Sequence, residues 1–426
     1  MFRHRQCSFS GIGGVLGAVL LAGAAAFEAQ AQVFPAETTA RGATVTTRPR
    51  PEFDPLGVRV GAFRLDAAAD LGLGYDDNVF AERRNRTGDG FFDWRLGAGL
   101  ESDWSRHAVG VAGNVGGRRY FSQGALDWLD WSVGAFGRLD IGAASSLEAR
   151  YTHRREHLDT GSVDLQQAGV AEPAPFDVDE FQIAGNTRLN RLALTALLNY
   201  QIFRFDDIAP GGVPQTLSAN DFQTWIAVVG AGYAFAPGRL GTLVARFQDI
   251  RYERAVSRGR DSFTWEVLVG FQYDFDGVWQ GRGGIGYRRR SYESPAIKDL
   301  EGPAFEAQVI WAPSQITTVT LGLRRTIEES ISLSRVSYTR TLLQANVDHE
   351  LLRNVILGLE LGADRRVYES PSLRATDAYA ILSGRWLLNR NMQLIASYQH
   401  VNRIEATGGA EEYYRNLIQV RLRMAI

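Results

Sequence analysis

The chain ends in NLIQVRLRMAI, residues 416–426, a stretch that alternates without interruption. Its apolar phase is Ile418, Val420, Leu422, Met424 and Ile426, and its polar phase includes Gln419, Arg421 and Arg423. A two-residue period is that of an extended strand, whose side chains alternate between two faces. A final strand that is apolar on one face and carries arginine on the other predicts the closing strand of a transmembrane β-barrel.

Polar turns recur upstream at nearly constant spacing. Short turns are expected at 105–106, 143–145, 190–191, 237–239, 276–277, 313–314, 353–354 and 389–391. Their spacing of about forty residues accommodates two strands of about ten residues or more and one longer loop. Longer polar segments include 76–89, 156–177, 206–220, 253–260, 369–374 and 403–411. The sequence therefore predicts an all-β fold, an antiparallel up-and-down transmembrane barrel of about eighteen strands over residues 58–426.

Charged residues occupy one phase of the predicted strands. They are expected to line a polar interior, because an arginine on the lipid side at mid-bilayer costs about 2–4 kcal/mol. The candidate pore-lining residues are Arg95, Glu101, Arg118, Arg150, Arg246, Arg282, Arg288, Arg324, Arg340, Glu360, Arg366, Arg385, Arg421 and Arg423. The excess of arginine in this set predicts a positive field that favours anions.

Aromatic residues collect near the predicted strand ends, as two interfacial girdles would require. They include Trp104, Tyr120, Phe121, Trp128, Trp131, Phe235, Tyr273, Phe275, Trp279, Tyr292, Trp311, Tyr368 and Trp386. A soluble β-sandwich or propeller is the alternative. Its strands would usually be shorter, near five or six residues, and its aromatic residues would lie in mid-strand more often.

The N-terminal region predicts export. Residues 1–31 combine a basic start, a short apolar run and the small-residue signature Ala29-Gln30-Ala31, which indicates a cleaved secretory signal peptide and an outer-membrane location for the mature protein. Cys7, the only cysteine, lies in this segment, so the mature chain has no disulfide or thiolate site. Residues 32–57 are rich in proline and lack periodicity, which predicts a flexible periplasmic lead-in.

No catalytic, cofactor, metal or nucleic-acid motif stands out in the sequence. Beyond the signal peptide, histidines occur only at His107, His153, His157, His349 and His400. His153 and His157 could share a strand end as a metal pair, although solvated loop histidines are the simpler interpretation. The glycines at 281, 283, 284 and 286 lie in a strand pattern and indicate close packing rather than a phosphate site. We therefore expect no enzyme and no cofactor.

Three stretches carry a family resemblance. They are Tyr75-Asp76-Asp77-Asn78-Val79-Phe80, the Glu172-Pro173 loop followed by Asn190-Arg191, and the run from Asn416. Over residues 56–426 the chain resembles the β-barrel porin family of proteobacterial outer-membrane proteins. The resemblance implies an outer-membrane channel, and some relatives accompany polysaccharide secretion systems. One departure is Ile426, because many such barrels end in an aromatic residue that the assembly machinery recognises.

The leading hypothesis is a porin-like channel that passes hydrophilic solutes or polysaccharide across the outer membrane. A dedicated exopolysaccharide or capsule export barrel with a periplasmic partner is one alternative, and an outer-membrane barrel enzyme is another. The expected partners are outer-membrane lipid and, through the C-terminal strand, the barrel-assembly machinery. A transporter with an internal plug domain and twenty-two strands is disfavoured, because about 395 mature residues cannot supply both.

Overall fold

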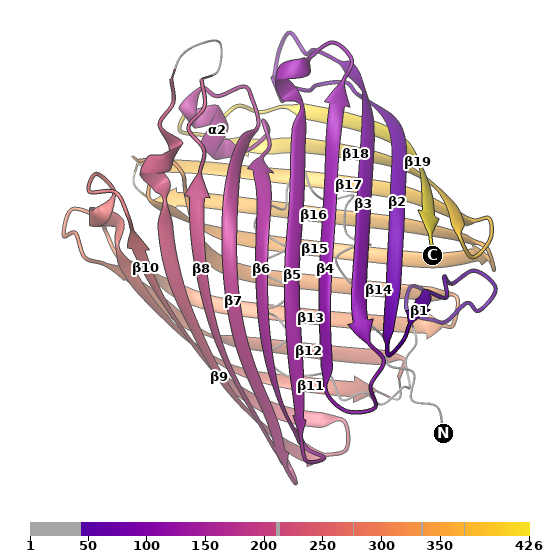
Figure 1. Cartoon of the computed structure of the whole chain (residues 1–426). Coiled ribbons are helices and arrows are strands. Elements are labelled where there is room, and N and C mark those ends of the chain that lie inside the picture. Colours follow the sequence, from indigo (N-terminus) through magenta and orange to yellow (C-terminus); the bar gives the residue numbers. More distant parts are fainter. Residues whose placement is uncertain (1–43, 210–213, 276, 334, 370) are drawn as a thin grey trace.

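A computed structural model of the protein describes residues 44–209, 214–275, 277–333, 335–369 and 371–426. In this part of the chain eighteen long strands, β2 to β19, each pair antiparallel with the next, and β19 pairs with β2 to close a barrel. The predicted fold is therefore confirmed. The walls formed by β2–β9 and β11–β18 cross at a large angle in Figure 1 because barrel strands tilt against the axis.

The strands are mostly 12 to 16 residues long, which suits tilted membrane-crossing strands. They are β1 Val58–Val60, β2 Phe63–Asp76, β3 Asp89–Ser102, β4 Ala108–Tyr120, β5 Trp128–Ile141, β6 Ser145–Leu158, β7 Ala174–Leu189, β8 Leu192–Phe205, β9 Phe222–Ala236, β10 Arg239–Tyr252, β11 Ser262–Phe275, β12 Trp279–Tyr292, β13 Leu300–Ser314, β14 Thr317–Glu329, β15 Ser337–Leu352, β16 Val355–Glu369, β17 Ser372–Leu387, β18 Met392–Ala406 and β19 Tyr414–Ala425. The helical elements are α2 Val163–Ala168 and the 3-10 turns η1 Gly124–Leu126, η3 Leu217–Asn220 and η4 Arg258–Arg260. No helix in the described part of the chain has the length and apolar character needed to cross a membrane.

The two ends of the barrel differ in their connections. The end with the short links β3–β4, β5–β6 and so on to β17–β18 is called the turn end here, and the opposite end is called the loop end. β1 pairs with the first residues of β2 at the turn end, where β19 no longer reaches. The strand pairing contradicts one predicted loop: β16 ends at Glu369 and β17 begins at Ser372, so residues 369–374 mostly continue the two strands as a tight hairpin.

The outward face shows the two predicted aromatic bands. Exposed rings near the turn end are Trp104, Tyr233, Phe235, Phe271, Trp279, Trp311 and Trp386, and those in the half toward the loop end include Tyr75, Trp225, Phe247, Phe263 and Tyr287. Exposed aliphatic residues such as Leu96, Val111, Leu243, Ile285 and Leu321 lie between them. Four of the predicted girdle residues occupy the inward phase instead. Tyr120 and Tyr368 are buried under the loops. Trp128 lies in register with the inward Arg118, and Tyr292 shares the inward phase of Arg290 in β12.

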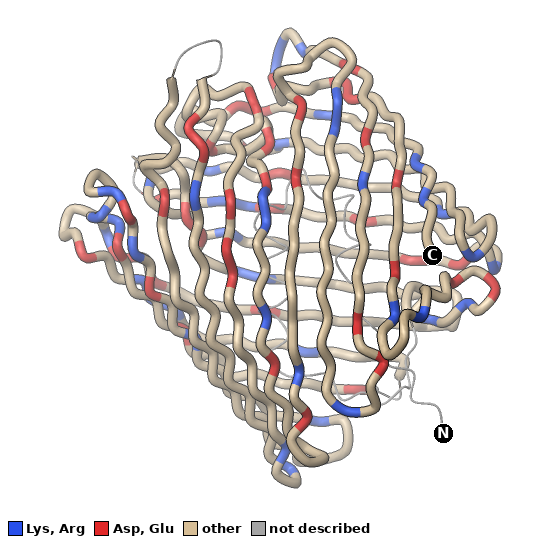
Figure 2. The backbone as a smooth tube through the Cα atoms, viewed as in Figure 1, with Lys and Arg blue, Asp and Glu red and all other residues tan. Residues whose placement is uncertain are grey.

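Charged side chains are not confined to the interior. Outward-facing examples are Arg155, Asp179, Arg204, Arg251, Arg289 and Arg365, all in the half of their strands toward the loop end. Figure 2 shows that the wall of β8 and β9 is almost free of charge, with Arg204 the only charged residue in these two strands. The simple alternation of charged-in and apolar-out therefore fails near the loop end, where polar headgroups rather than hydrocarbon would surround the strands.

A recurring aspartate organises the loop end. The carboxylates of Asp127, Asp221 and Asp261 each accept a hydrogen bond from the backbone N–H of an aromatic residue that ends the preceding outgoing strand. Those residues are Tyr120, Phe205 and Tyr252, at distances of 2.8, 2.8 and 2.7 Å, and Asp299 does the same for Tyr292 at 3.2 Å. Each aspartate accepts a hydrogen bond from a backbone N–H that has no partner on a neighbouring strand. The carboxylate therefore fixes the residue at which the strand pairing ends.

Residues 44–54 lie against the inner wall at the turn end. Val45 is fully buried against Ile356 and Leu387, and its N–H donates to Thr318 Oγ1 at 2.9 Å. The guanidinium groups of residues 48 and 50 both contact the carboxylate of Glu350. This part of the predicted lead-in is therefore anchored rather than flexible, because an apolar side chain and ion pairs secure it. Residues 32–43 and the predicted signal peptide, residues 1–31, lie outside the described residues.

Candidate functional site: the lumen and its inward loop

All fourteen candidate pore-lining residues occupy the inward phase of their strands. In β19, Arg421 and Arg423 share a phase with buried Arg415 and Gln419, whereas Ile418 and neighbouring apolar residues of the other phase are exposed. The same parity places the other candidates inward, for example Arg95 beside buried Asp93 in β3. The alternation thus places these charged side chains on the inner wall of the barrel. Whether each of them lines the transport path stays a prediction.

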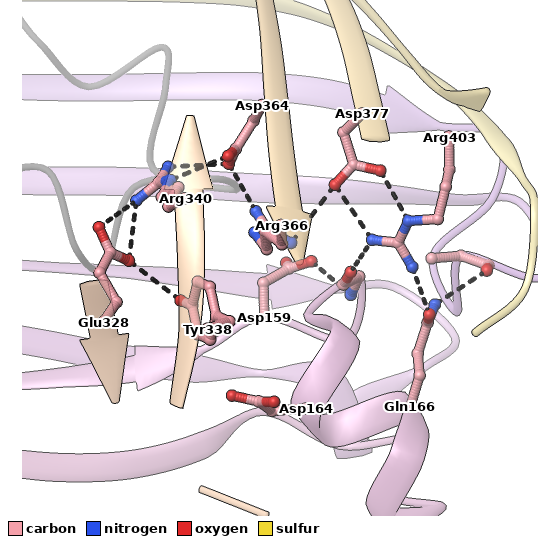
Figure 3. Close-up of polar contacts among 12 residues, drawn as sticks. Asp159, Asp164, Gln166, Glu328, Tyr338, Arg340, Asp364, Arg366, Asp377 and Arg403 are labelled. Atoms are coloured by element: carbon pink, nitrogen blue, oxygen red, sulfur yellow. Dashed lines mark hydrogen bonds and ion pairs between the residues drawn. The ribbon is translucent and has the colours of Figure 1, made fainter. Parts of the chain in front are cut away.

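A continuous series of ion pairs runs along this wall from β14 to β18 (Figure 3). Arg340 forms a two-pronged contact with Asp364, with both distances 2.9 Å, and also reaches Glu328. Asp364 also pairs with Arg366 at 2.7 Å. The series continues through Asp377 to Arg403, whose Nε lies 2.6 Å from the carboxylate. Planar guanidinium groups suit such a series because each can bind two carboxylates in fixed geometry.

A second cluster lies on β10 to β13. Arg246 binds Glu266 at 2.6 Å and Glu306 at 2.9 and 3.0 Å, and Arg288 pairs with Glu266 from the other side. These ion pairs stiffen the wall, and the inward guanidinium groups of Arg282 and Arg324 also act on Glu306.

The sector formed by β2, β3, β4 and β19 is different. Asp93 is fully buried and is the carboxylate for both Arg95 and Arg118, at 3.5 and 3.6 Å. Arg421 projects beside them from β19 and forms no ion pair within the described ranges. Asp70 of β2 is the second carboxylate, in register with Arg95 and Arg423 and 4.0 Å from the Arg423 guanidinium. These four arginines, Arg95, Arg118, Arg421 and Arg423, and these two aspartates form the arginine sector, which therefore carries a local surplus of positive charge.

The loop between β6 and β7, residues 159–173, folds inward across the loop end. It contains α2, one and a half turns long, which ends at Gly169 with a left-handed φ of 68°. The Gly169 and Val170 N–H groups bond back to Gln166 and Leu165, which terminates the helix as glycine typically allows. On one side Leu165 and Val170 pack into the apolar cluster of Phe176, Phe205, Phe222 and Ile250.

The polar side of this loop contacts the opposite wall. Asp164 accepts hydrogen bonds from Ser330 Oγ at 2.8 Å and from Tyr368 Oη at 2.9 Å. Arg403 donates to the Gly161 carbonyl at 2.8 Å and to the Gln166 side chain at 2.5 Å, as Figure 3 shows. The ion-pair series of the wall therefore continues into the loop and anchors it across the lumen.

A further ion pair attaches the start of the loop to the closing strand. Arg415 of β19 lies 3.1 Å from Asp159 and also pairs with buried Asp76 of β2. Thr160 Oγ1 donates to the Val79 carbonyl at 2.9 Å, so the loop between β2 and β3 is part of the same assembly. The inward loop is thus held on three sides.

A cavity of about 300 Å³ lies beneath α2. One side is neutral and largely apolar, with Phe176, Phe222 and Ile226 from β7 and β9. The other side carries guanidinium groups, including Arg246 and Arg340. The cavity can therefore hold a solute that combines a polar or anionic part with an apolar part.

Burial affects two ionisable groups of the loops. The pKa of the Asp164 carboxyl is raised because the group is removed from water, although the hydroxyls of Ser330 and Tyr368 partly offset the effect. Burial also raises the pKa of Tyr413 to about 12 despite the nearby Arg403 guanidinium. The neutral form of Asp164 is therefore favoured in the docked loop relative to a solvated carboxyl.

The described residues contain no group of three or more histidine, cysteine or acidic side chains arranged for a metal ion. His153 hydrogen-bonds Asp179 at 2.9 Å and packs on Trp131, whereas His157 contacts Asp130 and stacks on Trp128. The two histidines thus have separate partners, and the structure does not bring them together as a pair.

Sequence reasoning missed several residues that organise the site. Asp377 and Arg403 complete the ion-pair series, and Asp159 and Asp164 hold the inward loop. Asp377 lies in the inward phase of a predicted strand, so the alternation rule could have found it. Arg403 is predicted to lie in the polar segment 403–411, but β18 continues to Ala406 and carries Arg403 on the wall. The loop carboxylates had no local signal, because their partners are distant in the sequence.

Comparison with known proteins identifies the family of the chain. The family model described as Putative beta-barrel porin 2 matches residues 50–426. No curated protein matches. Similar solved structures include the outer membrane protein OpdK of Pseudomonas aeruginosa, 13% identical with a TM-score of 0.45, covering 85% of this chain and 99% of that one. OccK2 (OpdF) of P. aeruginosa and OccAB4 of Acinetobacter baumannii are each 11% identical, with TM-scores of 0.48 and 0.47, covering 85% of this chain and 98% of theirs. The family match spans the whole barrel, and the chain therefore belongs to the Putative beta-barrel porin 2 family.

Proposed function

We propose that the protein is a diffusion channel for small hydrophilic solutes, with a preference for anions, and that the inward loop forms its constriction. The observation that carries the proposal is a closed barrel whose inner wall is charged and crossed by one anchored loop. An eighteen-stranded barrel is wide enough to hold an aqueous path unless loops fill it. In the outer membrane the loop end would face the exterior and the turn end the periplasm.

The anion preference derives from the arginine sector. Most wall arginines have a carboxylate partner, so their fields largely cancel. The arginine sector is less fully compensated, because only Asp93 and Asp70 face its four guanidinium groups. A surplus of fixed positive charge raises the local concentration of anions and eases their passage.

Planar-bilayer recording tests both parts of the proposal. The folded protein is expected to conduct ions, and a KCl gradient should give a reversal potential displaced toward that of chloride. Arg421→Gln should reduce this displacement. Arg59→Gln is the matched control, because Arg59 lies on β1 and pairs with Asp103 in an exposed position. A folded protein that never conducts would contradict the channel, and equal selectivity in all variants would contradict the role of the arginine sector.

Two alternatives receive no specific support. No feature of the described residues favours polysaccharide export over a diffusion channel, and none of the same residues was identified as a catalytic group.

A further inference from the structure

The barrel wall is split between β13 and β14 near the loop end. These strands pair from Trp311 and Val319 up to Phe305 and Arg325, and no further toward the loops. Both strands nevertheless continue: residues 300–304 stay paired with β12, and residues 326–329 stay paired with β15. Each half of the wall is therefore intact, and a seam opens between the two.

The sequence explains why the ladder stops there. Pro303 has no N–H to donate, and Gly302 has a φ of 151°, outside the range that other residues adopt readily. Arg288 lies opposite Gly302 on β12, and its guanidinium donates to the Arg325 carbonyl of β14 at 3.2 Å. The Arg288 side chain thus passes Gly302 and links β12 to β14 by a hydrogen bond.

The seam contains a cleft of about 380 Å³ that is lined from both faces of the wall. Arg288 and Ile327 line this cleft and also the cavity beneath α2, so the two spaces adjoin at these side chains. On the outer side the cleft is bordered by Arg289, Lys298 and Arg325, together with acidic side chains at positions 299, 301 and 369.

The charges in this cleft are unevenly compensated. Arg289 pairs with Asp299 at 3.0 Å and lies 3.8 Å from Glu301, which occupies two of the acids. Lys298, the only lysine in the sequence, and Arg325 form no ion pair among the residues that the structure describes. Arg325 occupies the outward phase of β14, where an unpaired guanidinium needs an anionic partner or water.

The position of the seam along the barrel axis indicates the source of an anionic partner for Arg325. Tyr287 is exposed, belongs to the aromatic band near the loop end and pairs with Pro303 at the level where the seam opens. Aromatic bands mark the boundary between hydrocarbon and headgroups, so the cleft begins at the headgroup layer and continues toward the loops.

We propose that the seam is a binding site for the anionic headgroup, phosphate or carboxylate, of an amphiphile in the outer leaflet, with Arg325 and Lys298 as its principal ligands. The apolar part of the molecule stays in the membrane, while its headgroup lies next to Arg288 at the edge of the cavity. The inference rests on the membrane placement of the proposed channel but not on conduction through the lumen.

Binding is tested with dodecyl phosphate and, separately, inorganic phosphate, using the folded full barrel in neutral detergent and native mass spectrometry. Dodecyl phosphate should bind, and the double variant Lys298→Gln/Arg325→Gln should weaken binding at least tenfold. The double variant Arg204→Gln/Arg365→Gln removes two outward arginines outside the seam and should bind as the wild type does. Equal binding in all three would overturn the site. Inorganic phosphate binding as tightly as dodecyl phosphate would overturn the membrane source.

The seam itself is tested by cysteine pairs, since the mature chain lacks cysteine. Gln308→Cys/Gly322→Cys joins two directly paired positions and should form a disulfide. Ala304→Cys/Thr326→Cys occupies positions that would pair if the ladder continued, and should not. Efficient crosslinking of the second pair would overturn the seam.

The binding test has a second variant in case the charge variants misfold. Ile327→Trp fills the seam and should weaken dodecyl phosphate binding, whereas Leu321→Trp, on the same outward phase of β14, is its control.

Conductance of the same variants separates this proposal from the channel. A barrel that binds dodecyl phosphate but never conducts would contradict the channel alone. A conducting barrel with unchanged binding in every variant would contradict the headgroup site alone.

Discussion

At the scale of single residues, the ion-pair series depends on a few carboxylates that each serve two arginines. Asp377 is the clearest case, because it contacts Arg366 and Arg403 and both its side chain and that of Arg403 are buried. Removing one member of a buried pair leaves the other charge without compensation, whereas exposed pairs contribute little.

We therefore expect Asp377→Asn to lower the free energy of unfolding by about 3–5 kcal/mol. The exposed aspartate of the Arg59–Asp103 pair provides the control, and Asp103→Asn should change stability by about 1 kcal/mol or less. Urea unfolding followed by tryptophan fluorescence measures both. Similar midpoints for the two variants would show that water in the lumen compensates the buried arginines.

At the scale of elements, two segments fold onto the inner wall from opposite ends. Residues 44–54 lie at the turn end on Thr318, Glu350 and Ile356, and the inward loop lies at the loop end. Both are joined to the wall by ion pairs rather than by strand pairing, so each can be released without breaking the barrel.

Release of the N-terminal segment should widen the turn end. We expect Arg48→Ala/Arg50→Ala to raise single-channel conductance, because both arginines anchor the segment through Glu350. Arg59→Ala, just beyond the segment and on the exposed β1, should leave conductance at the wild-type value. Bilayer recording measures this, and unchanged conductance in the double variant would place the segment outside the conducting path.

Docking of the inward loop should depend on pH through Asp164. The pKa of this carboxyl is raised in the docked loop, so its neutral form is the more stable one there. Docking is therefore strongest below the ordinary carboxyl pKa of about 4 and weakens as pH rises through the raised value. Limited proteolysis of residues 159–173 should accelerate over that rise, and Asp164→Asn should abolish the pH dependence. Faster cleavage at low pH would contradict the assignment.

At the scale of the whole molecule, closure by β19 and β2 is what allows the strands to exist in a membrane. Truncation at Asn416 would expose the edges of β2 and β18, whose unpaired backbone groups cost several kcal/mol each in hydrocarbon. We expect the truncated chain to lose the heat-dependent mobility shift of a folded barrel on gel electrophoresis. Ile426→Ala, which keeps the strand, should retain it. A shift in the truncated protein would indicate a barrel that closes without β19.

Much of the architecture can be predicted from short stretches of the sequence. Alternation with period two identifies a strand and its inward face, and turn spacing counts the strands, because both depend only on near neighbours along the chain. The charged inner wall follows from the same rule. Even the end of the pairing between β13 and β14 has a local signature in Gly302-Pro303, although nothing local shows that each strand stays paired with its other neighbour.

Only the tertiary structure decided what occupies the lumen. Asp164 meets Tyr368 across 204 residues of sequence, and Arg50 meets Glu350 across 300, so no window of the chain contains both partners. The same distance hid the anchoring of residues 44–54, which lack periodicity and resemble a free lead-in. A strand can be recognised from the alternation of its own side chains. A docked loop is stabilised by residues that come near it only after the barrel has closed.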